Sequence, residues 1–394
     1  MAPLDRPVFA EPQLITDSLA LAALCERLSS EPYITVDTEF MRERTYWPEL
    51  CVVQLGGAEE VAVVDTTAAG LDLAPLGALL ANTKVLKIFH AARQDVEIFL
   101  QLFGAVPAPM FDTQVAAMVA GFGDQVGYEG LVGSLTNGQI DKSHRFSDWS
   151  ARPLSAAQVT YAAADVTWLR VVYQKLVERL AREGRTEWVA QEMAILSEPA
   201  TYRPAPEILW EKLRPRTNNR RVLGALRAIV AWREREAQRI NIPRQRLVRD
   251  ESLLEIAATM PLNVDALARI RGIARGFAEG ATGRSLLSVL ETAAAQPDEN
   301  LPERLALREG PKPSPALVAL LKVLLAEKAE AHDVAPKLLA NTEDLERLAA
   351  EDAPDVPAMH GWRREVFGED ALALKSGKIA LSVAGKRIKL VPVG

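Results

Sequence analysis

The pattern of hydrophobic and polar positions predicts a domain of mixed strands and helices in the first half of the chain. Ile34 and Val36 are apolar and β-branched, which predicts a buried strand over residues 34–40. Leu21, Leu24 and Leu28 recur at helical spacing and predict a preceding helix over residues 17–28. The other expected strands cover residues 50–55, 61–65 and 85–89. The other expected helices cover residues 73–80, 90–100 and 155–180, with a helix opening at Phe111-Asp112-Thr113 and a short helix within 121–138. The strands at 50–55 and 61–65 flank Gly56-Gly57, which favours an antiparallel meander over a βαβ repeat.

The second half of the chain has helical periodicity almost to its end. A long helix is expected over residues 220–239, followed by a break at Asn241-Ile242-Pro243 and short helices. A second block, from residue 314 to about 364, has a similar plan, which indicates a weak internal repeat. The tail alternates apolar and polar residues around Ala384-Gly385-Lys386 and predicts a hairpin. The expected domains cover residues 1–202, 203–295, 310–376 and 377–394.

Two acids interrupt the apolar strand at residues 34–40. Asp37 and Glu39 are two residues apart, so on a strand both side chains point to the same face. Two neighbouring carboxylates repel each other and are costly to bury, and a divalent cation would remove both costs. The alternative is that the strand ends at Val36 and both acids are solvated loop residues.

Three further residues fit a site built from oxygen ligands. Asp95 lies on the helix that follows the strand at 85–89. Tyr161 and Asp165 are four residues apart, so they share one helix face. Four carboxylates and a phenol, without His or Cys, suit Mg²⁺ or Mn²⁺ and argue against zinc.

Composition limits the class of protein. The chain has 394 residues, 48% of them hydrophobic, and a net charge of −6, which argues against bulk coating of nucleic acid. The segment 203–249 is the exception, because it holds 13 Lys or Arg and only 4 Glu. Cys25 and Cys51 allow no disulfide framework and no Cys-rich zinc site. No signal peptide or membrane helix is visible, so a cytoplasmic protein is expected.

The order and flanks of these motifs resemble a known family. Asp37-Thr38-Glu39, His90 to Asp95 and Tyr161 to Asp165 are similar to the three exonuclease motifs of the DEDD superfamily, in the subtype with tyrosine. The longer strings VDTEFMRERTYWPELCVVQLGG, FHAARQDVEIF, FDTQVAA, DKSHRFSDWSARPLS and YAAADV resemble the ribonuclease D family. The basic helical block resembles the helicase-and-RNase-D C-terminal (HRDC) domain, and the second block resembles a degenerate copy of it.

This resemblance implies a fold and a reaction. The fold would be a ribonuclease-H-like exonuclease domain, with a mixed sheet and helices on both faces, followed by two small all-α domains. The activity would be 3′–5′ exoribonuclease trimming of structured RNA, above all tRNA precursors with single-stranded 3′ ends, releasing 5′-mononucleotides. Asp37, Glu39, Asp95 and Asp165 would hold two divalent cations, and Tyr161 would orient the attacking water. A DNA exonuclease of the same superfamily and an RNA-binding scaffold with an inactive nuclease domain are the alternatives. A monomer is expected.

Six residues are candidates for contact with the substrate. They are Thr38, Phe40, Met41, His90, Lys142 and Arg220. An exonuclease needs a surface that stacks on the terminal bases, which Phe40 and Met41 could supply, although aromatic residues also serve as core. His90, at the start of the expected helix 90–100, could bind a phosphate or the terminal sugar, or simply begin that helix. Asp112 is expected to cap a helix rather than to approach the metals.

Overall fold

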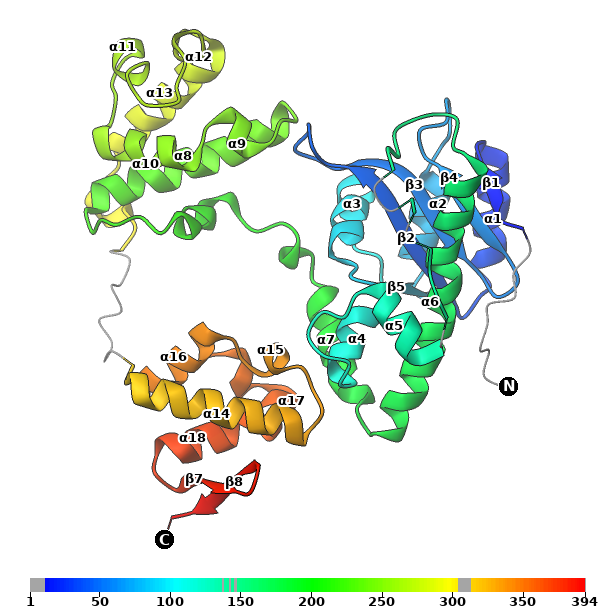
Figure 1. Ribbon diagram of the computed structural model, residues 1–394. Helices are drawn as coiled ribbons and strands as arrows, with labels where there is room; N and C mark the ends of the chain where they lie inside the picture. Colours follow the sequence, from blue (N-terminus) through cyan, green and yellow to red (C-terminus); the bar gives the residue numbers. More distant parts are fainter. Residues whose placement is uncertain (1–10, 137, 142, 145–146, 304–312, 394) are drawn as a thin grey trace. The chain divides into compact units, whose positions relative to one another are not determined.

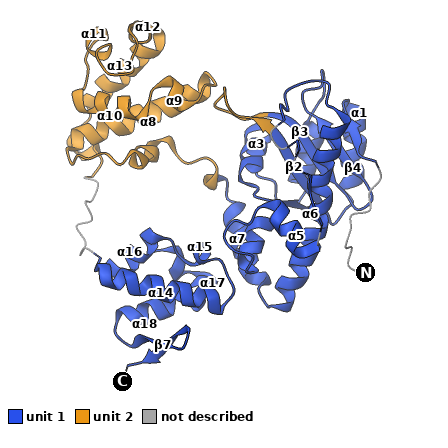
Figure 2. Ribbon diagram, viewed as in Figure 1, with its two compact units in different colours: residues 1–39, 50–199, 310–394 blue, residues 40–49, 200–309 orange. Residues whose placement is uncertain are grey.

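The computed structural model describes residues 11–136, 138–141, 143–144, 147–303 and 313–393. The chain forms two compact units (Figure 2). The first unit comprises residues 1–39, 50–199 and 310–394, and the second comprises residues 40–49 and 200–309.

A six-stranded mixed sheet forms the centre of the first unit. The strands are β1 Gln13–Ile15, β2 Tyr33–Met41, β3 Glu49–Gly56, β4 Val61–Asp65, β5 Leu86–Phe89 and β6 Met110–Asp112, in the order β1-β4-β3-β2-β5-β6. Strands β3 and β4 are antiparallel, as the meander predicted, whereas β2, β5 and β6 run parallel to one another. Because neighbouring parallel strands run in the same direction, the part of β2 after Thr35 lies beside the residues that follow β5 and, next to them, those that follow β6.

Seven helices accompany this sheet in the described part of residues 11–199. They are α1 Ser18–Leu28, α2 Ala74–Ala81, α3 Arg93–Phe103, α4 Thr113–Val119, α5 Tyr128–Thr136, α6 Ala156–Arg182 and α7 Thr186–Leu196. Helix α6 packs on β4 and β5 and crosses the front of the sheet in Figure 1, with α2 behind it. Ser155 caps α6 with Gln158 in a reciprocal capping box, as the predicted N-cap requires.

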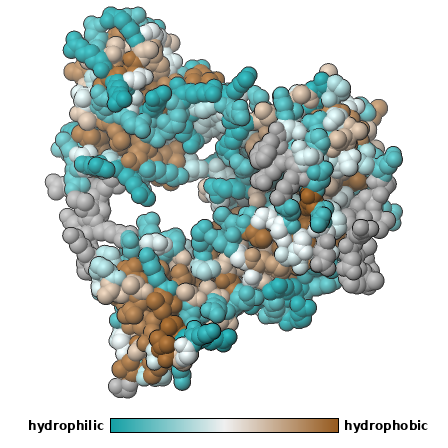
Figure 3. Space-filling view, viewed as in Figure 1, coloured by the Kyte–Doolittle hydropathy of each residue, from teal (hydrophilic) through white to brown (hydrophobic). Residues whose placement is uncertain are grey.

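The last block of the chain belongs to the first unit. Its elements are α14 Pro315–Ala331, α15 Pro336–Leu339, α16 Thr342–Ala350, η4 Pro357–Met359, α17 Gly361–Arg363, η5 Arg364–Gly368, α18 Glu369–Lys375 and the hairpin β7 Ile379–Ala384 and β8 Arg387–Pro392. Trp362 stacks on Trp188 of α7, with ring centroids 4.6 Å apart. Glu192 of α7 accepts hydrogen bonds from the Trp362 indole at 2.9 Å and from Arg363 at 2.6 Å. Figure 3 shows hydrophobic surface on this block, where Leu320 and Val323 are exposed.

The second unit is all-helical apart from residues 40–49. Its elements are η2 Pro206–Leu213, α8 Arg220–Arg239, α9 Arg244–Leu247, α10 Asp250–Thr259, α11 Val264–Leu267, α12 Arg275–Glu279, α13 Ala281–Ala294 and η3 Asp298–Asn300, with the short η1 Pro199–Thr201 at its boundary. Tyr46 packs against the core of this unit and its hydroxyl donates to Glu234 of α8. Trp47 donates its backbone N–H to the Asn241 side chain at 3.0 Å. The end of β2 and the following turn therefore fold with residues 200–309.

The two helical blocks share an element order. Each begins with a long helix, α8 or α14, followed by a four-residue helix, α9 or α15, and then a helix of intermediate length, α10 or α16. Gly272 in the first block and Gly361 in the second both have positive φ. These features support the predicted repeat without establishing that the second block is an HRDC domain.

Among the described residues of 11–198, the sequence patterns missed three elements and misplaced the start of one. Strands β1 and β6 are only three residues long and α7 follows directly on α6, so no period separates them from their surroundings. Helix α3 begins at Arg93 rather than at His90, because Ala91 has φ +58° and turns the chain before the helix. Among the described residues, no helix is both long and apolar enough to cross a membrane.

Candidate active site

The face of β2 that carries the two acids is held against α6. Thr35 lies two residues before Asp37 on that face, and its hydroxyl donates to the Val166 carbonyl oxygen at 2.7 Å. A Cβ on Gly56 of the neighbouring strand would lie 2.4 Å from the Thr35 hydroxyl and 3.4 Å from that carbonyl oxygen. The glycine therefore allows the close approach that brings Asp37 and Glu39 opposite Asp165.

Asp95 reaches the same site from α3. Its carboxylate accepts a hydrogen bond from the hydroxyl of Thr38, which lies between the two acids of β2. Strands β2 and β5 are parallel neighbours, so the start of α3, which follows β5, lies beside the end of β2. The structure thus gives Thr38, predicted as a substrate contact, a side-chain bond to Asp95.

Burial raises the pKa of all four carboxyl groups, and repulsion from neighbouring carboxylates adds to this for Glu39, Asp95 and Asp165. Burial raises the pKa of Asp37 to about 7. Burial, and then the charges of Asp37, Asp165 and Asp95, raise the pKa of Glu39 to about 9. Burial and Asp37 raise the pKa of Asp165 to about 8, and they hold the pKa of Asp95 well above its ordinary value. The charge of Asp37 therefore acts on Glu39, Asp95 and Asp165 and disfavours their ionisation.

Tyr161 lies one helical turn before Asp165 on α6 and hydrogen-bonds to its carboxylate. Its ring lies 6.0 Å from that of Trp149 and 6.3 Å from that of His144, measured between centroids. Trp149 is only 3% exposed. The segment that contains Trp149 thus forms part of the surroundings of the phenol.

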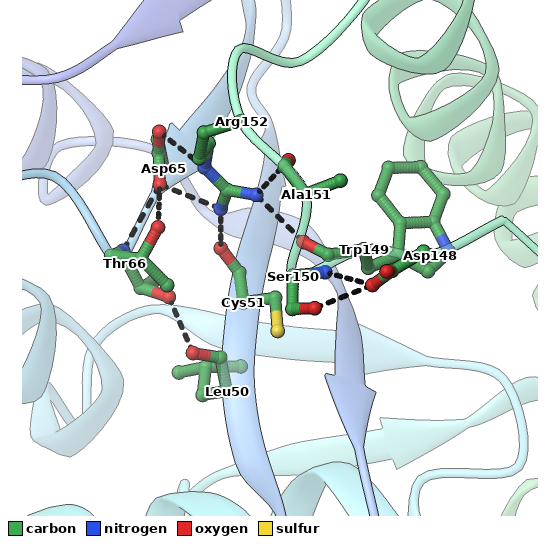
Figure 4. Close-up of polar contacts among 10 residues, drawn as sticks. Leu50, Cys51, Asp65, Thr66, Asp148, Trp149, Ser150, Ala151 and Arg152 are labelled. Carbon is green, nitrogen blue, oxygen red and sulfur yellow. Dashed lines mark hydrogen bonds and ion pairs between the residues drawn. The ribbon is translucent and has the colours of Figure 1, made fainter.

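Arg152 anchors that segment to the sheet (Figure 4). Its guanidinium bonds both oxygens of Asp65 at 2.7 Å, and it donates to the backbone carbonyl oxygens of Cys51, Trp149 and Ala151 at 2.7–2.9 Å. Burial opposes ionisation of Asp65, but the bonds from Arg152 and Thr67 outweigh it and lower its pKa. The ion pair therefore stays charged and fixes the end of the segment that packs on Tyr161.

Asp112 caps α4, as predicted, and also holds the chain before α3. Its carboxylate accepts from the backbone N–H groups of Gln114 and Val115 in α4, and from those of Ala91 and Ala92. With both oxygens satisfied by backbone donors, Asp112 caps α4 and also fixes the turn that precedes α3.

One cavity of about 480 Å³ collects most of these side chains. Four of the five predicted catalytic residues line it, namely Asp37, Glu39, Tyr161 and Asp165. Thr38 and His90 line it too, whereas Asp95 lies behind the wall with its carboxylate bonded to Thr38. The sequence patterns missed other lining residues, among them Gln114, Tyr128 and Ile140.

Comparison with known proteins places this site in a family. The 3′–5′ exonuclease family matches residues 12–181, and the HRDC domain family matches residues 222–290. Ribonuclease D of Gluconacetobacter diazotrophicus is 66% identical over 392 residues, and that of Granulibacter bethesdensis is 67% identical over 395 residues. Both alignments cover 100% of this chain and 100% of the relative. The chain belongs to the ribonuclease D family.

The crystal structure of Escherichia coli RNase D, described as an exoribonuclease involved in structured RNA processing, has the same fold. It superposes with a TM-score of 0.80 at 31% identity, over 93% of this chain and 99% of that one. As a member of the ribonuclease D family, the protein is a 3′–5′ exoribonuclease. The predicted ribonuclease-H-like exonuclease domain and one HRDC domain are confirmed, and the second HRDC domain stays a prediction.

Three of the predicted substrate contacts of this ribonuclease D either do not line the cavity or serve other bonds. Phe40 and Met41 do not line the cavity, and residues 40–49 fold with the second unit. Arg220 donates to the backbone carbonyl oxygens of Asp298, Leu301 and Pro302. Lys142 lies outside the described residues.

His90 lies at the cavity with a largely buried ring. Its Nδ1 is 3.0 Å from the Thr113 hydroxyl, and that hydroxyl also donates to the Phe89 carbonyl oxygen at 2.9 Å. Burial lowers the pKa of His90, against the opposing effect of Asp112.

The four carboxylates fit a hard divalent cation by their chemistry. They supply only oxygen donors, and their raised pKa values record a concentration of negative charge that a cation would neutralise. No three acidic, histidine or cysteine side chains in the described ranges already form a ligand shell. Binding of an ion would therefore require these side chains to move from the positions described.

Proposed function

We propose that this ribonuclease D trims the 3′ ends of structured RNA, in particular tRNA precursors, by two-metal-ion hydrolysis that releases 5′-mononucleotides. The observation that carries the proposal is the convergence of three carboxylates and a phenol on one cavity, with Asp95 directly behind them. The comparison with an exoribonuclease of structured RNA processing supports the substrate class.

Four side chains would hold the ions. Asp37, Glu39, Asp95 and Asp165 are the proposed ligands of two Mg²⁺ or Mn²⁺ ions, which, when bound, activate water and stabilise charge on the leaving oxygen. Tyr161 is hydrogen-bonded to Asp165 and faces the cavity, so its hydroxyl is placed to orient the attacking water. A tyrosine hydroxyl, whose ordinary pKa is about 10, suits a hydrogen-bond donor better than a base.

The second unit would contact the RNA backbone through part of its basic segment. Arg220, Arg221 and Arg227 donate to backbone carbonyl oxygens of residues 294–302, so they hold that unit together. Lys212, Arg214 and Arg216 are exposed, and no described hydrogen bond or ion pair involves their side chains. Arg214 and Arg216 also line a groove of about 700 Å³ with apolar residues of α8 and α10. Free cations beside an apolar groove suit a single-stranded nucleic acid.

We also propose that the protein acts as a monomer in the cytoplasm. Both cysteines are buried as free thiols, which is usual in a reducing compartment. The described residues contain no helix able to cross a membrane.

The direct test compares Asp37→Asn with the wild type on matched RNA and DNA duplexes with 3′ overhangs. With Mg²⁺, the wild type should release 5′-mononucleotides from RNA, and EDTA should abolish the release. Asp37→Asn should lose this activity and still bind RNA, while the exposed Glu59→Gln should behave as the wild type. A pre-tRNA with a 3′ trailer and the same tRNA without it then test the proposed substrate. Activity that survives Asp37→Asn, or equal digestion of trailer and mature end, would contradict the proposal.

A further inference from the structure

A tyrosine outside the exonuclease motifs is bonded to the backbone of a proposed metal ligand. Tyr128 is the first residue of α5, and its hydroxyl donates to the backbone carbonyl oxygen of Asp165. The backbone N–H of Leu169 hydrogen-bonds to the same hydroxyl. In an α-helix the N–H of residue 169 faces the carbonyl of residue 165. The Tyr128 hydroxyl therefore contacts both members of one i to i+4 backbone pair of α6, the carbonyl oxygen of Asp165 and the N–H of Leu169.

Helix α5 holds Tyr128 in place independently of the acids. Leu131 and Val132 are fully buried and pack with Ala116, Ala117 and Val172 in one core cluster. Helices α5 and α6 lie side by side (Figure 1). The Tyr128 ring also packs on His90, with centroids 5.2 Å apart. The hydroxyl thus reaches α6 from a rigid support, which is what a fixed bond to the Asp165 peptide requires.

The environment of Tyr128 keeps its proton on the oxygen. Burial, and then the charges of Asp165 and Asp37, hold the pKa of Tyr128 well above its ordinary value. The neutral phenol is the form that donates its proton to the Asp165 carbonyl oxygen.

We propose that Tyr128 is a positioning residue for Asp165, which sets the direction in which that carboxylate enters the metal cluster. Asp165 hydrogen-bonds to Tyr161 and shares the cavity with Asp37 and Glu39. A rotation of the Asp165 peptide would therefore displace both the Asp165 carboxylate and the Tyr161 hydroxyl. The inference rests on the proposed role of Asp165 as a metal ligand.

The test is Tyr128→Phe, which removes the hydroxyl and keeps the ring. Groups that orient a metal ligand typically change metal affinity or activity about 10–100-fold when removed. The variant should bind Mn²⁺, measured by calorimetry without RNA, about 10–100-fold more weakly, with kcat reduced and KM for RNA unchanged. Hydrogen exchange of the peptide that covers residues 165–170 should accelerate, because the Leu169 amide loses a partner.

Tyr33→Phe is the matched control. It also removes a tyrosine hydroxyl bonded to α6, since Gln174 donates to Tyr33 at 2.7 Å, but it does so nine residues beyond Asp165. It should leave Mn²⁺ binding and kcat within about twofold of the wild type, a range smaller than the effect expected at Tyr128. Equal effects of the two variants, wild-type Mn²⁺ binding by Tyr128→Phe, or a change in KM alone would each overturn the inference. If Asp165→Asn left Mn²⁺ binding intact, the proposed metal site itself would fail, which is a distinguishable result.

Discussion

Glu39 should make the metal-free exonuclease domain less stable as pH rises. Its pKa is raised from 4.5 to about 9, chiefly by burial and then by Asp37, Asp165 and Asp95. Between these two values the folded protein binds a proton that the unfolded chain has released. The stability linked to Glu39 is therefore complete below pH 4.5, falls as pH rises, and is lost once pH passes about 9.

The size of the effect follows from proton linkage. One proton taken up on folding changes the free energy of unfolding by about 1.4 kcal/mol per pH unit. From pH 5.5 to 7.5 the Glu39 contribution should thus fall by about 3 kcal/mol. Glu39→Gln removes the group that takes up this proton and also lowers the repulsion on Asp37. The free energy of unfolding of the variant should therefore fall less steeply with pH and should be greater than that of the wild type at pH 7.5.

The assay is urea unfolding in EDTA, monitored by the hydrogen exchange of peptides from β2 and α6. These peptides report on this domain alone. Glu59→Gln, an exposed position two residues before β4, is the control and should keep the wild-type slope. Saturating Mg²⁺ should abolish the destabilisation at high pH, because a bound cation replaces the protons. If the free energy of unfolding fell with pH as steeply in Glu39→Gln as in the wild type, the claim that Glu39 is buried among other carboxyl groups would be refuted.

Three further predictions address other parts of the molecule. Arg152→Lys keeps the charge but cannot bond Asp65 and three carbonyl oxygens together, so the domain should lose about 1–3 kcal/mol of unfolding free energy and kcat should fall; an unchanged denaturation midpoint would contradict this. Replacing Lys212, Arg214 and Arg216 by Gln should lower the salt slope of RNA binding by about 2, since single strands release about 0.7 counterion per contact; an equal loss on replacing the exposed Arg246, Arg249 and Arg269 would point to diffuse binding. Asp112→Ala should cost about 2 kcal/mol, measured by thermal unfolding, because it removes the cap of α4 and the bonds to Ala91 and Ala92; a wild-type melting temperature would argue against both roles.

The parts of the site that the sequence predicted are those set by local periodicity. Asp37 and Glu39 share a face because strand period is two, and Tyr161 and Asp165 share one because helical neighbours are four apart. The bonds that hold this face in place join residues distant in sequence, as with Thr35 and Val166 or Asp65 and Arg152. No period of the sequence encodes such pairs.

The same limit explains the predictions about substrate contacts. The charge of Arg220 could be read from the sequence, but not that carbonyl oxygens of residues 298–302 would bind it. The helix predicted from His90 begins later because Asp112 holds the backbone of Ala91 and Ala92. Tyr128 escaped notice because a single aromatic residue near a helix start carries no motif.

The measurement that tests the central claim most directly is the number of Mn²⁺ ions bound per chain, counted by electron paramagnetic resonance with a non-hydrolysable RNA 3′ end in place. Four carboxylates around one cavity predict two ions for the wild type, and fewer than two for Asp37→Asn and Asp165→Asn. Binding of a single ion by the wild type, or of two ions by both variants, would contradict the account.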